Sequence, residues 1–265
     1  MSTLSANPRL FRGGVKYYLK YRSTYPSLLI DRVAWLCQIT ATSRVLDLGC
    51  GPGILARAFA PFCGAVVGVD PEPDMIEAAK KHLADYADKA SFLCASTHEL
   101  SEDMGTFSMV TIGRAFHWMD RGATLDLLDK LIDERGAVVL FRDPAVKVPE
   151  NEWRKAFDRV FDDFASTEAA RLGAQTLLMA TDEAHLLRSA FRKLERISTV
   201  VTRSLTIDHL IGRAFSMAGT SPDDLKERLP AFEEAMRSAL APFAAEGRLV
   251  EITEPQALIA RRESA

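Results

Sequence analysis

Apolar positions follow two different periodicities along this chain. Short apolar runs rich in β-branched residues predict buried strands, and stretches with apolar residues three and four positions apart predict helices. Predicted strands and helices alternate over the first half of the chain, which is typical of an α/β fold with a doubly wound, mostly parallel sheet. The helix before the fifth strand is predicted to end at Gly136. The first five predicted strands are Arg44–Leu48, Ala65–Val69, Ser91–Cys94, Ser108–Ile112 and Ala137–Phe141.

After the fifth strand the pattern becomes mainly helical. Aromatic residues recur at helical spacing over residues 153–164, and this stripe predicts a buried helix face. Leu194–Arg203 is the next predicted strand. A closing strand is predicted from two apolar runs, Leu249–Thr253 and Ala257–Arg261, which Pro255 interrupts.

These elements predict one domain over residues 1–265. We expect residues 15–143 to form its core, and residues 144–192 and 205–246 to form a helical cap inserted after the fifth strand. The composition agrees with a globular chain, because 48% of residues are hydrophobic and 26% are charged.

The charge and the cysteines narrow the class of protein. The net charge is −3, so the basic surplus of a nucleic-acid-binding protein is missing, and nucleic acid is not expected as the main partner. No apolar run is long enough to span a bilayer, and no signal peptide is recognisable. The four cysteines show no C-x-x-C spacing, so neither a metal site nor a disulfide framework is expected. We therefore expect a cytoplasmic protein.

A glycine-rich turn follows the first predicted strand, in the segment VLDLGCGPG at residues 45–53. Glycine allows positive φ and leaves no Cβ to block a ligand. Asp70 ends the next strand, 21 residues after Gly49, where a carboxylate can accept both hydroxyls of a ribose. The spacing is G-x-G-x-G, with Ile54 at the position where the dinucleotide fingerprint requires glycine, and no G-K-[ST] follows.

The segments VLDLGCGPG and VVGVDPEPDMI resemble the first two motifs of the class I S-adenosylmethionine-dependent methyltransferases. The resemblance continues through SFLCASTHEL and MVTIGRAFHWMD and covers residues 15–143. It implies a Rossmann-like sheet of seven strands, six parallel and the last antiparallel. It also implies S-adenosyl-L-methionine as cofactor, S-adenosyl-L-homocysteine as product and a small-molecule acceptor methylated on oxygen, nitrogen or carbon.

The resemblance assigns cofactor-binding roles to the glycine turn and the strand after it. Asp70 would hold the ribose hydroxyls. Pro71 and Met75 would pack against the adenine, with the thioether of Met75 filling an apolar gap. The residues expected around the methionine part of the cofactor are Asp47, Gly49, Gly51 and Gly53.

Two further segments complete the implied cofactor site. Ser96 stands where the family often has an aspartate facing the adenine amine, so Ser96 and Thr97 are expected there with a backbone N–H as the substitute donor. Gly113 and Arg114 leave the fourth strand and would approach the methionine end. Relatives often carry glutamine at the position of Arg114.

His117 follows the fourth strand and would lie near the transferable methyl group. A hydroxyl, phenol or ring nitrogen would benefit from a base of near-neutral pKa, which suits histidine, whereas a carboxylate acceptor needs none. The alternative is a loop residue that orients Trp118. The sequence supports both interpretations of His117.

The aromatic and basic segment YYLKYRSTYP at residues 17–26 resembles the Y-x-x-Y-R-P-x-Y-P segment of the trans-aconitate methyltransferase-like subgroup. There it forms a lid over the cofactor. Ser23 replaces the usual proline. Tyr18 and Arg22 would meet the cofactor carboxylate. The alternative is that the tyrosines only pack the first helix against the sheet.

Two other functions compete with a small-molecule methyltransferase. A methyltransferase of nucleic-acid bases usually carries an N/D-P-P-Y type motif after the fourth strand, and this chain has Arg114-Ala115-Phe116-His117 there. A domain that binds the cofactor without turnover would keep the same glycine turn and Asp70.

Overall fold

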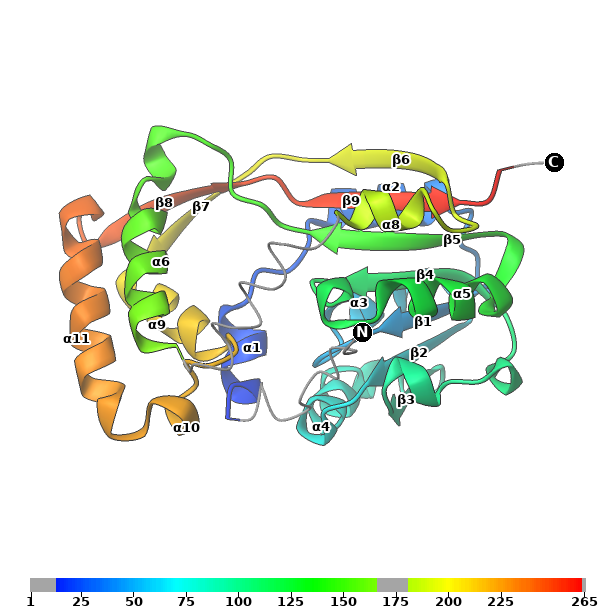
Figure 1. The fold of residues 1–265 in the computed structure, drawn as a ribbon, viewed down its shortest axis with the longest axis horizontal. Coiled ribbons are helices and arrows are strands. Elements are labelled where there is room, and N and C mark those ends of the chain that lie inside the picture. The colour runs from blue at the N-terminus through cyan, green and yellow to red at the C-terminus, as the bar shows by residue number, and fades with distance from the viewer. Residues whose placement is uncertain (1–12, 166–180, 264–265) are drawn as a thin grey trace.

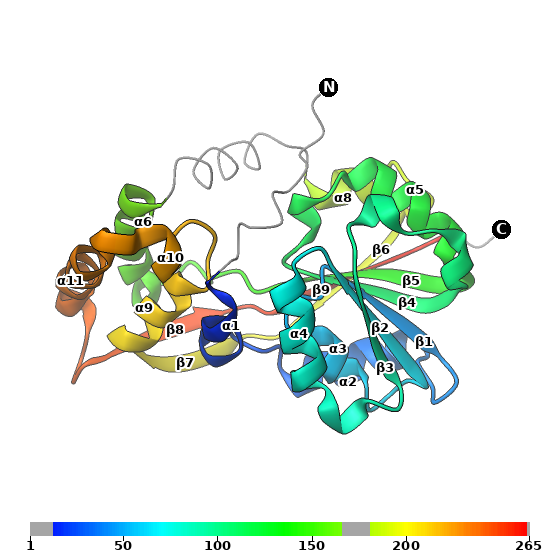
Figure 2. The same ribbon diagram turned by 90° about the horizontal axis from the view of Figure 1, so that it is seen from below.

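The computed structural model describes residues 13–165 and 181–263. Figures 1 and 2 show two lobes: a sheet-bearing core and a cap of helices beside it. The segment 166–180, which the sequence places in the cap, lies outside the described residues, as does the segment 1–12.

The core sheet has seven strands in the order β3-β2-β1-β4-β5-β9-β6. Neighbouring strands from β3 to β5 pair in parallel, and β9 pairs antiparallel with both β5 and β6. Six strands therefore run in one direction and the last strand of the chain opposes them, which confirms the predicted fold class. The strands are β1 (Arg44–Leu48), β2 (Ala65–Asp70), β3 (Ala90–Cys94), β4 (Phe107–Gly113), β5 (Ile132–Arg142), β6 (Lys193–Ser198) and β9 (Gln256–Arg261).

Helices cover both faces of this sheet (Figure 2). Phe59, Met109 and Phe141 belong to one apolar cluster beneath the first face, and Leu125, Leu128 and Phe191 to a second beneath the other. Burial of these two clusters supplies the main driving force for folding the core. The first face carries α2 (Ser27–Leu36), α3 (Ile54–Phe59) and α4 (Pro73–His82), and the second carries α5 (Arg121–Leu131) and α8 (Asp182–Leu186).

The cap has its own apolar cluster and a small sheet. Trp153 and Phe157, from the predicted aromatic stripe, are buried against Leu210, Phe215 and Phe232. The short N-terminal helix α1 packs on α9. The cap elements are α6 (Trp153–Phe164), β7 (Val201–Thr206), α9 (Ile207–Phe215), α10 (Pro222–Leu225), α11 (Leu229–Leu240) and β8 (Arg248–Thr253), and α1 spans Val15–Tyr21.

A pair of antiparallel strands crosses from the core into the cap. The predicted strand Leu194–Arg203 is divided into β6 in the core sheet and β7 in the cap, and the predicted closing strand is divided in the same way into β9 and β8. At the break the N–H of Thr199 donates to the carbonyl of Pro255 at 3.0 Å. Nearby, the N–H of Glu254 donates to the carbonyl of Pro144 at 2.8 Å, where the chain first leaves the core.

Two sequence-based boundaries are wrong. Helix α8 lies in the segment predicted as cap, yet Leu186 is fully buried in the second core cluster. The helix predicted to end at Gly136 ends at Leu131, and Gly136 lies inside β5. A Cβ at Gly136 would lie 2.9 Å from the carbonyl oxygen of Ser108, so glycine permits close strand packing there and does not end a helix.

Candidate functional site

The glycine turn joins β1 to α3 at the carboxyl edge of the sheet. Gly49, Gly51 and Gly53 have φ values of +67°, +52° and +82°, which L side chains rarely adopt. The N–H groups of Gly49 and Cys50 both donate to the carbonyl of Val69, at 2.8 and 2.9 Å. The turn is therefore fixed to the end of β2.

Asp70 lies across the turn, at the end of β2. Its Oδ2 accepts from the N–H of Gly51 at 2.8 Å, and its Oδ1 accepts from the N–H of Glu72 at 3.0 Å. Burial raises the pKa of this carboxyl above its usual value, and the two N–H groups oppose that shift. Each carboxylate oxygen keeps a second acceptor position, so the fixed carboxylate can still accept from two hydroxyls.

Asp47 is buried beneath the same turn and is 1% exposed. Its Oδ2 accepts from the N–H of Ala56 at 2.9 Å, and its Oδ1 accepts from the hydroxyl of Thr111 at 2.9 Å. Burial raises the pKa of Asp47 to about 7. These contacts attach the first turn of α3 to β1 and β4, so Asp47 positions the glycine turn from below.

The residues expected around the adenine come from three places at the same edge. Met75 is buried on α4, with its sulfur 3.9 Å from where a Cβ on Gly51 would lie, whereas Pro71 is exposed. The N–H and hydroxyl of Ser96 donate to Glu99 at 2.7 and 2.8 Å, which caps the 3₁₀ turn that begins at Thr97.

The structure brings Tyr18, Arg22 and Arg114 together although the last is far from the others in sequence. The guanidinium groups of Arg22 and Arg114 lie 5.3 and 5.9 Å from the ring centroid of Tyr18. Arg114 has φ +56° and donates to the carbonyl of Ser23 at 3.3 Å. A Cβ on Gly113 would lie 2.7 Å from Leu55, so the chain leaves β4 in tight contact with α3.

His117 lies on a 3₁₀ turn, Phe116–Trp118, after β4. Its ring stacks at a tilt on Trp118, with centroids 4.8 Å apart. Burial lowers the pKa of His117 to about 4; Asp182 opposes the shift, and Arg121 and Arg142 add to it. The imidazole is therefore neutral at pH 7 and a weaker base than an ordinary histidine.

A cavity of about 140 Å³ lies between the core and the cap, and we call it the interlobe cavity. Ser23 and Arg114 line it from the core, and Arg154, Arg213 and Glu251 line it from the cap. The sequence analysis missed these three cap residues, because they lie outside the segment with the family resemblance and no motif surrounds them.

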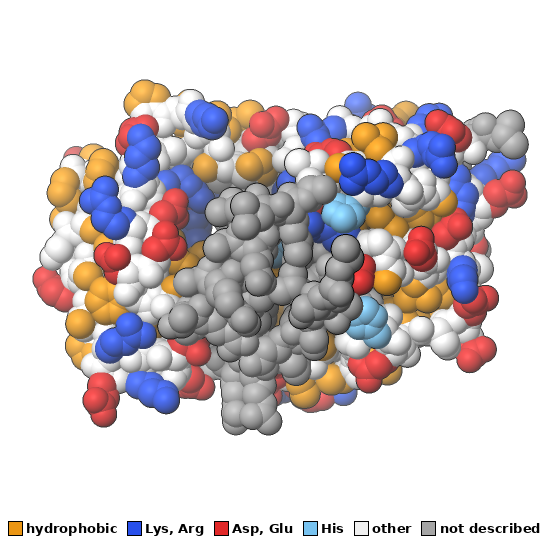
Figure 3. All heavy atoms as spheres, in the orientation of Figure 1, with side chains coloured by type: hydrophobic (Ala, Val, Ile, Leu, Met, Phe, Trp, Pro, Cys, Tyr) orange, Lys and Arg blue, Asp and Glu red, His pale blue; other side chains and the backbone are white. Residues whose placement is uncertain are grey.

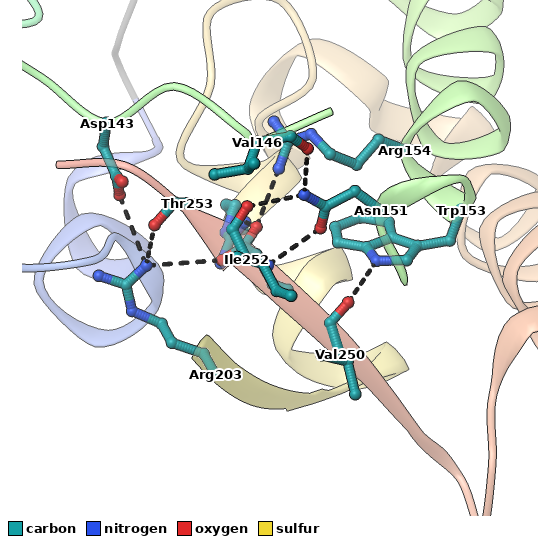
Figure 4. A network of polar contacts seen from close by, with 11 residues as sticks. Asp143, Val146, Asn151, Trp153, Arg154, Arg203, Val250, Ile252 and Thr253 are labelled. Carbon is teal, nitrogen blue, oxygen red and sulfur yellow. Dashed lines mark hydrogen bonds and ion pairs between the residues drawn. The ribbon is translucent and has the colours of Figure 1, made fainter. Parts of the chain in front are cut away.

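A polar network beside this cavity holds α6 on β8 (Figure 4). The side-chain amide of Asn151 donates to the carbonyls of Val146 and Ile252, both at 2.7 Å, and accepts from the N–H of Ile252 at 3.0 Å. The indole N–H of Trp153 donates to the carbonyl of Val250 at 2.8 Å. Arg154, the next residue on α6, is thereby held at the cavity wall.

Two further observations bear on the class of protein. Within residues 13–165 and 181–263, no helix is both long and apolar enough to cross a membrane. The same residues contain no cluster of three or more His, Cys, Asp or Glu side chains suited to a metal ion.

Residues 45–136 match the model of a methyltransferase domain family. A protein described as a methyltransferase in Dictyostelium discoideum is 20% identical over 247 residues, covering 92% of this chain and 91% of that protein. An uncharacterised methyltransferase of Schizosaccharomyces pombe is 35% identical over 107 residues, 40% of each chain. A ubiquinone biosynthesis O-methyltransferase of Dechloromonas aromatica is 37% identical over 83 residues, 30% of this chain and 36% of that protein.

Solved structures share the fold. The S-adenosylmethionine-dependent methyltransferase of Geobacter sulfurreducens, solved in complex with S-adenosyl-L-homocysteine, is 15% identical, with a TM-score of 0.54 over 97% of this chain and 98% of that chain. The YcgJ protein of Bacillus subtilis is 19% identical, with a TM-score of 0.56 over 90% and 100%. Residues 45–136 thus match a methyltransferase domain, the chain shares its fold with S-adenosylmethionine-dependent methyltransferases, and the prediction of a methyltransferase is confirmed.

Proposed function

We propose that this protein transfers a methyl group from S-adenosyl-L-methionine to an oxygen, nitrogen or carbon atom of a small-molecule acceptor and releases S-adenosyl-L-homocysteine. One observation carries the proposal: three glycines with positive φ follow β1, and the N–H of the middle one, Gly51, donates to the carboxylate of Asp70 at the end of β2. Ligands of open α/β sheets bind at this carboxyl edge. The structure from Geobacter sulfurreducens was solved in complex with S-adenosyl-L-homocysteine, which supports S-adenosyl-L-methionine as the cofactor.

The residues of the turn fit this cofactor. A Cβ on Gly51 would meet only the sulfur of Met75, at 3.9 Å, so glycine leaves the space over the turn open. The backbone of Gly49, Gly51 and Gly53 would surround the methionine part above Asp47. Asp70 would accept the two ribose hydroxyls. Pro71 and Met75 would pack against the adenine. The adenine amine would contact the side chains or backbone of Ser96 and Thr97.

The methionine carboxylate would lie near Tyr18 and Arg22, because guanidinium groups pair well with carboxylates. Arg114 would approach the methionine end of the cofactor. Gly113 would allow the cofactor to approach the end of β4. When bound, the cofactor supplies a methyl group on a sulfonium, which is already a good leaving centre. The protein then has to align the acceptor and, for a protonated acceptor, remove a proton.

His117 is the proposed proton acceptor. It is neutral at pH 7, so a ring nitrogen is free to take the proton of an acceptor hydroxyl. Its low pKa suits an acidic hydroxyl, such as a phenol, better than an alcohol. The names of the ubiquinone-biosynthesis relatives support oxygen as the acceptor atom.

The lid-like segment at residues 17–26 supports the small-molecule, trans-aconitate methyltransferase-like subgroup, because α1 packs on the cap and Arg22 bonds to it. Acidic and basic side chains are interspersed over the described part of the face drawn in Figure 3, and the net charge of −3 disfavours nucleic acid. We place the protein in the cytoplasm, where its free thiols at Cys37, Cys50, Cys63 and Cys94 stay reduced.

Calorimetric titration with S-adenosyl-L-methionine and S-adenosyl-L-homocysteine tests the proposal. We expect micromolar binding and a loss of about 10²-fold or more in Asp70→Ala, which removes two charge-assisted hydrogen bonds. Asp88→Ala, an exposed aspartate near β3, is the matched control and should leave the affinity unchanged.

Failure of the unaltered protein to bind either compound contradicts the proposal. Transfer of labelled methyl into RNA or DNA would favour the nucleic-acid alternative. Tight binding without transfer to any small molecule in an acceptor screen would favour a binding domain.

A further inference from the structure

A single buried carboxylate is shared by three arginines of the cap. Glu251 on β8, 1% exposed, accepts from Arg213 at 2.5 and 3.0 Å and from Arg154 at 2.9 Å. Arg203 lies 3.9 Å from Glu251 and 3.7 Å from Asp143. Asp143 and Glu251 therefore serve three guanidinium groups, of which those of Arg154 and Arg213 line the interlobe cavity.

Two arginines on the opposite wall have only neutral hydrogen-bond partners. Arg22 donates to the hydroxyl and carbonyl of Ser216 at 2.8 and 3.2 Å, and Arg114 donates to the carbonyl of Ser23. No carboxylate within residues 13–165 and 181–263 forms an ion pair with either. Burial, together with the positive charges of Arg114 and Arg213, lowers the pKa of Arg22 to about 10.

The cavity therefore carries an excess of positive charge. Four arginines and three acidic residues line it. Arg203 lies outside the lining but pairs with two of those acids, so five guanidinium groups share three carboxyls. The Nε–H groups of Arg114 and Arg213 are buried without a hydrogen-bond partner in the described chain. Buried donors and uncompensated charges are costly, and an anion in the cavity would satisfy both.

We propose that the interlobe cavity binds an anionic group of the methyl acceptor, a carboxylate or a phosphate, between Arg114 of the core and Arg154 and Arg213 of the cap. Guanidinium groups bind both anions through paired N–H donors. This inference rests on the proposed function, since it assigns a recognition element to the acceptor of that reaction.

Size and position agree with this role. A volume of about 140 Å³ is small beside the roughly 300–1,000 Å³ of pockets that hold a whole ligand, so the cavity suits one substituent of the acceptor. Arg114 directly follows β4 and Asp143 directly follows β5, at the same sheet edge as the glycine turn after β1. The rest of the acceptor can therefore extend from the cavity toward the turn.

Titration of the full chain with small anions tests the inference. Glutarate and glycerol 3-phosphate are the probes, glutaramide and glycerol are their uncharged counterparts, and each is titrated with and without saturating S-adenosyl-L-homocysteine. We expect at least one anion to bind about tenfold or more tightly than its counterpart in both conditions. Stronger binding of glutarate identifies a carboxylate, and stronger binding of glycerol 3-phosphate a phosphate.

Variants locate the binding. Arg154→Gln should weaken anion binding about tenfold, because Arg213 still pairs with Glu251 and the cap keeps its fold. Arg159→Gln, an exposed residue on the same helix, is the matched control and should bind as the unaltered protein does. Arg114→Gln tests the core wall of the cavity, because Arg114 forms no ion pair with Glu251.

Three outcomes overturn the inference. The first is that the anions bind no better than their uncharged counterparts under conditions in which the cofactor binds. The second is that Arg154→Gln and Arg114→Gln lower the melting temperature and leave anion affinity unchanged, which makes the cluster structural. The third is that S-adenosyl-L-homocysteine displaces the anions, which assigns the cavity to the cofactor. Loss of S-adenosyl-L-homocysteine binding itself contradicts the proposed function and is measured separately.

Discussion

The glycine turn and the interlobe cavity are polar centres built in different ways. In the turn, Asp47 accepts from the backbone N–H of Ala56, 9 positions away, and Asp70 accepts from the N–H of Gly51, 19 positions away. The exception is a bond to Asp47 from the side-chain hydroxyl of Thr111. In the cavity, side chains bind side chains across 97 positions in the pair Arg154–Glu251. A backbone-held site needs little more than a local motif, whereas the cavity requires the two lobes to be assembled.

Replacing Glu251 should separate the two centres most clearly. Glu251→Gln leaves three arginines without their shared carboxylate, and we expect a loss of about 3–5 kcal/mol in the free energy of unfolding. Denaturant unfolding measures this loss. Affinity for S-adenosyl-L-homocysteine should stay within about threefold, and Glu227→Gln, an exposed cap residue, should change neither quantity. A large loss of cofactor affinity would show that the two centres are coupled.

Asp47 allows the same comparison from the core side. Asp47→Ala leaves the N–H of Ala56 unpaired and leaves the hydroxyl of Thr111 with only its 3.4 Å contact to the carbonyl of Leu46, at a cost of about 1–3 kcal/mol. Asp47→Asn, which resembles the protonated carboxyl, should cost about 1 kcal/mol or less. Because the folded pKa of about 7 exceeds the usual 3.8, Asp47 stabilises the fold least at high pH, and its contribution falls as pH rises from about 4 through 7. Unfolding curves across this range should lose that slope in the Asn variant.

Two glycines with positive φ separate strain from site geometry. An alanine Cβ at Gly49 would lie 2.5 Å from Ala115, whereas at Gly247, between the cap helices and β8, it would meet nothing within 4 Å. Gly247→Ala should therefore cost only the backbone strain of about 1–2 kcal/mol, with cofactor affinity intact. Gly49→Ala should cost more than this and also reduce cofactor affinity about tenfold or more. Equal effects of the two substitutions would mean that the contact with Ala115 is easily relieved.

The pH dependence of methyl transfer tests His117, outside both centres. A proton acceptor works from its neutral form, so an ordinary histidine would lose activity below about pH 6.5. The pKa of His117 is about 4, so kcat should stay level down to about pH 5 and fall near pH 4. His117→Gln should lower kcat by about 10²-fold without changing cofactor affinity. A midpoint near 6.5 would assign the titration to another group.

Much of the core could be predicted from the sequence, because each strand is an apolar run bounded by turn residues. β1 was expected at the bounds it has, and Asp70 was expected beside the glycine turn. The division of Leu194–Arg203 into β6 and β7 could not be predicted from that run, which contains neither glycine nor proline. The sequence signal for this break is Pro255, which lies between the partner strands β8 and β9.

The cap site could not be predicted for a different reason. Arg154 and Arg213 have the same sequence context as solvent-exposed arginines, and only the packing of α6 and α9 on β8 brings them to Glu251. The pattern also cannot show that burial makes His117 a weak base, because its neighbours Arg142 and Asp182 are distant in sequence.

The bond between Glu254 and Pro144 gives the chain a modular character. The chain leaves the core at Pro144, re-enters it in α8 and β6, and finally returns from the cap at Glu254, which is joined to Pro144 at 2.8 Å. The excursion after β6 begins at Thr199 and ends at Pro255, and these two ends are joined at 3.0 Å. Next to them, Arg142 already pairs with Gln256 in the core sheet. A segment whose ends meet at the surface of a finished domain can be lengthened, shortened or exchanged without moving the strands that flank it. The cap can therefore be exchanged while the glycine turn is kept unchanged.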